Sequence, residues 1–70
     1  MVSLFIDFSI PDYVLYEIDE YIKLYKKGKV KFSRFDNIIA LIHLAVINNR
    51  ITKEQSLILI EQLNTISPYN

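Results

Sequence analysis

The strongest constraint on the fold is the run of residues 38–47, in which nine of ten side chains are apolar and only His43 interrupts. The run is too short for a membrane span, which needs about 20 apolar residues. A helix that is apolar almost all round must be covered on more than one side. The run therefore predicts a central, buried helix, which we place at residues 34–48.

Size and composition predict a single domain over residues 1–70, of which 51% are hydrophobic. A chain of this length buries only about 60% of its unfolded surface and is marginally stable alone. With no cysteine and one histidine, we expect no disulfide, no metal, no cofactor and no enzymatic activity. Eight basic and eight acidic residues cancel, which excludes a uniformly basic nucleic-acid-binding protein but not a local basic patch.

The N-terminal residues alternate between apolar and more polar side chains, which predicts a strand with one buried face. Its inward side chains are Leu4, Ile6, Phe8 and Ile10, and its outward ones are Ser3, Phe5, Asp7 and Ser9. A lone strand leaves backbone groups unpaired. Its partner is either the short segment at residues 29–32 or the same strand of a second molecule. We favour the second pairing, antiparallel across a two-fold axis, which predicts a homodimer.

Three capping boxes and two stop signals predict three helices. The first helix, at residues 10–27, is opened by Ser9 with Asp12 and ended by Gly28. The second is opened by the box at residues 33–36 and ended by the asparagines at 48–49, and the third, at residues 53–64, is opened by the box at 52–55. The third helix is expected to bury Leu57, Ile58, Ile60 and Leu63, while Leu59 and Ile66 lie off this stripe. Residues 67–70 are expected to fray.

The chain contains, in order, the predicted strand, Ser-Ile-Pro-Asp, the first predicted helix, a glycine and Ser-Arg-Phe-Asp-Asn-Ile. This order resembles the ribbon-helix-helix superfamily, the group of the Arc, methionine and CopG repressors. The resemblance implies a mainly α fold, an intertwined homodimer with an intermolecular two-stranded ribbon. Residues 3–48 would form its β-α-α core, and residues 52–65 an additional C-terminal helix. The expected dimer core is Leu4, Ile6, Phe8, Ile10, Val14, Ile18, Ile38 and Ile42. Small proteins of this type occur in plasmids, toxin–antitoxin operons and archaeal viruses, so we expect a cytoplasmic protein, in the host cell if it is viral.

The resemblance also implies a DNA-binding regulator whose ribbon enters the major groove of double-stranded DNA. The ribbon would face the bases with Phe5, Asp7 and Ser9. The start of the second helix, with Ser33 and Arg34, would hold a phosphate. Residues 23–34 contain six of the eight basic residues and no acid, which adds Lys29 and Lys31 as phosphate contacts.

The alternative is a protein–protein interaction module, an inhibitor or adaptor without a specific DNA site. Asp7 favours it, because a carboxylate on the ribbon would face a polyanion. The tyrosines of the first helix, at positions 13, 16, 21 and 25, favour packing over a base-stacking platform, because they lie among acidic residues. A steep salt dependence of DNA binding would distinguish the regulator from the interaction module.

Overall fold

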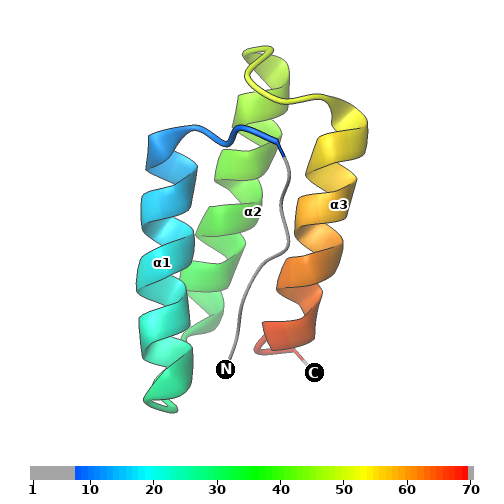
Figure 1. The fold of residues 1–70 in the computed structure, drawn as a ribbon. Coiled ribbons are helices and arrows are strands. Elements are labelled where there is room, and N and C mark those ends of the chain that lie inside the picture. The colour runs from blue at the N-terminus through cyan, green and yellow to red at the C-terminus, as the bar shows by residue number, and fades with distance from the viewer. Residues whose placement is uncertain (1–7, 70) are drawn as a thin grey trace.

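Three helices form an antiparallel bundle in the computed structural model, which describes residues 8–69 (Figure 1). Their order is α1 (Asp12–Lys26), α2 (Phe32–Ile47) and α3 (Lys53–Leu63), followed by the 3-10 turn η1 (Asn64–Ile66). Helices α1 and α3 both contact α2, and residues 8–11 cross one end of the bundle to reach α1. Helix α2 is therefore the central element, as its apolar sequence predicts.

The prediction of a ribbon-helix-helix fold is wrong, because residues 8–69 form helices and turns and contain no strand. Two neighbouring helices of the same chain cover much of the apolar surface of α2, while Leu44 and Ile47 on its outer side stay exposed. The residues predicted for the strand from Leu4 to Asp7 lie outside the described residues, and Ser9 and Ile10 lie in the crossing segment. The homodimer stays a prediction.

The hydrophobic core runs between the three helices within one chain. It is formed by Ile10, Val14, Ile18, Tyr21, Phe35, Ile38, Ile42, Ala45, Ile51, Leu59, Leu63 and Ile66, with Phe8 packed against its edge. Five of the residues expected in a dimer core are thus buried in the monomer's own core: Ile10, Val14, Ile18, Ile38 and Ile42. Burial of such apolar side chains is the main force that holds the bundle together.

The face that helix α3 presents to the core matches the predicted one only in part: Leu63 is buried and Ile60 packs partly buried against the core, as predicted. Leu59 and Leu63 are fully buried, whereas Leu57 and Ile58 are 58% and 46% exposed. Residues 57–60 are all apolar, so two overlapping helical stripes fit this sequence equally well. The observed stripe includes Ser56, whose hydroxyl donates a hydrogen bond to the carbonyl of Lys53 at 2.6 Å and is therefore satisfied in its buried position.

Only one of the three predicted capping boxes forms. Thr52 and Gln55 exchange the two expected hydrogen bonds at the start of α3, at 3.1 and 2.9 Å. Helix α1 starts at Asp12 with Pro11 before it and no side-chain cap, so Ser9 does not open it. Helix α2 starts two residues earlier than predicted, after Lys31 and again without a side-chain cap.

The two predicted stop signals are confirmed. Gly28 and Asn49 adopt left-handed backbone conformations, with φ of 69° and 58°. After Gly28 the amide of Lys29 reaches back to the carbonyl of Leu24 at 2.9 Å, which satisfies an end carbonyl of α1. This turn directs the chain away from α1, and the connection from α1 to α2 lies at one end of the bundle (Figure 1).

Candidate functional site

The connection between α1 and α2 carries a cluster of positive charge, which we call the basic corner: Lys26, Lys27, Lys29 and Lys31. All four side chains are exposed, and none forms an ion pair with another described residue. Lys23, one turn earlier, differs because it lies 3.3 Å from both Asp19 and Glu20. Hydrogen bonds to Glu20 and Asp19 raise the pKa of Lys23. Within the predicted basic segment, these four lysines are therefore the ones whose charge is not compensated by an acidic partner.

The start of α2 adds a second source of positive potential beside this corner. No side chain caps the helix, and its first intrahelical amide bond is that of Phe35 to the carbonyl of Lys31 at 3.3 Å. The amides of the first turn therefore carry the positive end of the helix dipole. Lys31, Ser33 and Arg34 line an open pocket of about 370 Å³ here, together with Glu17 and Asn37.

Arg34 has a different role from the one predicted. Its guanidinium lies 3.4 Å from the carboxylate of Glu17, and both side chains are partly buried. The ion pair links α1 to α2, and both of its residues line the pocket. A phosphate in the pocket would meet the charge of Glu17, and the charge of Arg34 is already paired. The exposed Lys29 and Lys31, which have no acidic partner, are therefore better placed for phosphate than Arg34 is.

Two exposed aromatic rings lie at the same end of the bundle. Tyr69 stacks on Phe32 with a centroid separation of 4.8 Å and meets Phe35 edge-on at 6.1 Å. Its hydroxyl donates to the carboxylate of Asp36, with oxygen distances of 2.7 and 2.9 Å, and this hydrogen bond raises the pKa of Tyr69. The expectation that residues 67–70 fray is therefore wrong for Tyr69. No local signal in the sequence could have paired Asp36 with a residue 33 positions away.

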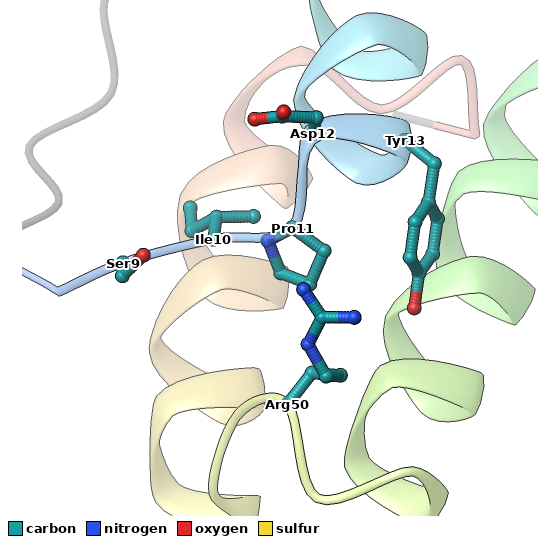
Figure 2. Close-up of a pocket in the computed structure, with 6 residues that line it drawn as sticks. All are labelled: Ser9, Ile10, Pro11, Asp12, Tyr13 and Arg50. Atoms are coloured by element: carbon teal, nitrogen blue, oxygen red, sulfur yellow. The ribbon is translucent and has the colours of Figure 1, made fainter.

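A second pocket, of about 290 Å³, lies at the opposite end of the bundle, where residues 9–13 approach Arg50 (Figure 2). In Figure 2 the guanidinium of Arg50 points toward Pro11, and the carboxylate of Asp12 points away from it. No ion pair joins Arg50 to a described acid. Asp12 also lines this pocket, but its carboxylate points away from Arg50, so the two charges are not combined in one site. We therefore regard this pocket as a weaker site than the basic corner.

Of the residues predicted to read DNA bases, only Ser9 lies in the described part of the chain, and it is far from the residues predicted to hold phosphates. Phe5 and Asp7 lie outside the described residues, and Ser9 lines the pocket beside Arg50. Lys29 and Lys31 lie at the other end of α2, a helix of 16 residues, which corresponds to about 24 Å. Ser9 and the basic corner therefore cannot form one compact contact surface.

Other kinds of site find little support in the described part of the chain. Residues 8–69 contain no cluster of three or more side chains able to ligate a metal ion. None of the helices described combines the length and apolar character needed to cross a membrane. The most distinctive chemical feature is thus the basic corner with its neighbouring aromatic pair.

Comparison with known proteins adds no relative to this picture: no family model, curated protein or solved structure matches the chain. A function can therefore be inferred only from the chain's own charges, exposed surfaces and contacts.

Proposed function

We propose that this protein is a small cytoplasmic nucleic-acid-binding protein that contacts the phosphate backbone through the basic corner. The observation that supports the proposal is the presence of four exposed lysines without acidic partners at one end of a chain whose total net charge is zero. Each lysine that neutralises a phosphate releases a condensed counterion, which favours binding at low salt. The uncapped start of α2 adds amide donors beside them.

The contacts in this proposal recognise phosphate and do not depend on base sequence. Lysine reaches phosphate as a point charge, without the fixed geometry that reads a base edge. The exposed acids of α1, such as Asp19, lie before the corner and would repel a strand that ran along that helix. A bound strand is therefore expected to cross the end of the bundle at the connector.

Reversing two charges of the basic corner tests the proposal. Lys27→Glu with Lys29→Glu is expected to weaken binding of a labelled oligonucleotide at least tenfold at low salt. Two lost phosphate contacts should also reduce the slope of log affinity against log salt by about 1.4–1.8. Fluorescence anisotropy at several salt concentrations measures both effects.

The matched control is Arg50→Glu with Lys53→Glu, which changes the net charge equally at the opposite end of the bundle. Lys53 is the first residue of α3, where an acidic side chain suits the helix dipole. The control should keep most of the wild-type affinity. An equal loss in both double variants would contradict a localised site, and no salt-dependent binding by the wild type would contradict the function itself.

A second candidate function is self-association through the outer face of α2. Ile47 is 74% exposed and Leu44 is 44% exposed, and Ala40 and His43 lie on the same exposed side. Residues 37–49 contain no Lys, Arg, Asp or Glu. Two copies related by a two-fold axis could therefore bring these faces together without opposing like charges. The occupant we propose for this face is a second copy of the chain.

Ile47→Glu tests this second candidate, because it would place two carboxylates in the symmetric contact. The variant is expected to sediment as a monomer at concentrations at which the wild type is dimeric. The matched control is Leu57→Glu on α3, which adds the same charge at a side chain that is 58% exposed. A wild type that remains monomeric at high concentration would rule out this interface.

A further inference from the structure

The aromatic pair beside the basic corner has a geometry suited to a nucleic-acid base. Phe32 and Tyr69 remain 57% and 58% exposed although their rings stack on each other. A nucleobase offers a flat π-face of similar size, on which an exposed aromatic ring can stack. The pair therefore presents unused stacking surface to solvent.

The pair adjoins the phosphate-binding lysines. Lys31 directly precedes Phe32, and Lys29 lies two residues before Lys31 in the short connector. Tyr69 reaches the same place from the C-terminal segment and stacks on Phe32. Positive charge and exposed rings are thus combined within one short stretch of surface, as they are in proteins that bind single strands.

Contacts within the protein hold the aromatic pair in place before any ligand binds. Asp36 accepts the hydroxyl hydrogen bond of Tyr69, and the buried ring of Phe35 supports Tyr69 from its edge. A ring fixed in this way loses less conformational entropy when a base stacks on it. The carboxylate of Asp36 repels phosphate on its own side of the rings, which favours a backbone path along Lys29 and Lys31.

We propose that the ligand of the basic corner is a single-stranded nucleic acid, with at least one base stacked on the Phe32–Tyr69 pair. The inference rests on the proposed phosphate-binding function and adds the strandedness of the ligand. Bases in a duplex are already stacked on their neighbours and cannot offer a face to these rings without being unstacked. Phosphate contacts alone would be shared by single strands and duplexes, whereas the rings favour the single strand.

The test compares oligo(dT), oligo(U) and a mixed-sequence DNA duplex of the same length in anisotropy titrations at one salt concentration. The wild type is expected to bind both single strands more tightly than the duplex. Phe32→Leu keeps an apolar side chain but removes the ring, and should lower single-strand affinity about tenfold. Its affinity for the duplex should stay unchanged. Tyr69→Leu should act in the same direction.

The matched control is Tyr16→Leu, which removes a 63% exposed aromatic ring from α1 and should leave every affinity unchanged. Circular dichroism verifies that each variant is folded. Equal affinity for single strands and duplex, or no effect of Phe32→Leu, would overturn this inference while the lysine-dependent proposal stands. If Lys27→Glu with Lys29→Glu left the affinity unchanged, the proposed function would be overturned instead.

Discussion

Leu59→Ala is expected to lower the free energy of unfolding by about 2–5 kcal/mol, the cost of removing a buried leucine and leaving a cavity. Leu59 is fully buried in the core that α3 shares with α2. The whole stability of a domain this small is about 4–10 kcal/mol on a per-residue basis. The substitution should therefore remove a large part of it, and the variant is expected to be partly unfolded at 37 °C.

Urea denaturation followed by circular dichroism at 222 nm measures this effect, with Leu57→Ala as the matched control. The control removes the same atoms from a side chain that is 58% exposed, so its effect should stay within about 0.5 kcal/mol. The helical stripe predicted from the sequence alone implies the reverse order, with Leu57 buried and Leu59 off the stripe. A larger loss for Leu57→Ala would contradict the orientation of α3 in the structure.

Local signals that end helices were a more reliable guide to the fold than the capping residues expected to start them. Gly28 and Asn49 end α1 and α2 because a left-handed residue is needed there, and that need depends only on neighbouring backbone. The box of Thr52 and Gln55 is similarly local. Capping residues alone were insufficient at the start of α2, where Asp36 binds Tyr69 instead of the helix start.

Features set by tertiary packing could not be predicted in the same way. Residues 57–60 place apolar side chains on all sides of one turn of α3, so its position against α2 decides that Leu59 faces inward. The alternation before Pro11 predicts a strand, yet Ile10 packs into a helical core as part of a crossing segment. A period of two over a few residues does not distinguish these outcomes.

The candidate site was predictable in its charge but not in its shape. Lys29 and Lys31 are recognisable as a basic segment because no acid interrupts them. The pairing of Arg34 with Glu17 and the stacking of Tyr69 on Phe32 depend on contacts between distant parts of the chain. Because of those contacts, we propose that a base stacks beside the lysines, in place of the ribbon that the sequence predicts to read a duplex.

Tyr21→Phe is expected to lower the free energy of unfolding by about 1–3 kcal/mol near neutral pH, because it leaves a buried carbonyl without its donor. Tyr21 is fully buried, and its hydroxyl donates to the carbonyl of Ile66, which ties α1 to η1. The ring packs against Phe35 with a centroid separation of 5.5 Å. Phenylalanine keeps this packing, so the substitution isolates the hydroxyl.

The same hydroxyl predicts how stability changes in alkali. Burial, and to a smaller extent the nearby Tyr25, raise the pKa of Tyr21 above its ordinary value of 10.0. The folded state thus favours the neutral phenol, and this contribution is fully present below pH 10. Above pH 10 the unfolded chain loses the proton first, so the contribution declines until pH passes the folded pKa.

Urea denaturation between pH 7 and pH 11 measures this dependence. The difference in stability between wild type and Tyr21→Phe is expected to be constant up to about pH 10, the ordinary pKa of tyrosine, and to shrink above it. Tyr16→Phe, at a 63% exposed ring, should follow the wild type throughout. A difference that stays constant to pH 11 would show that Tyr21 gives no alkaline dependence. In that case, folding would not disfavour ionisation of the Tyr21 hydroxyl that donates to the carbonyl of Ile66, contrary to what its burial implies.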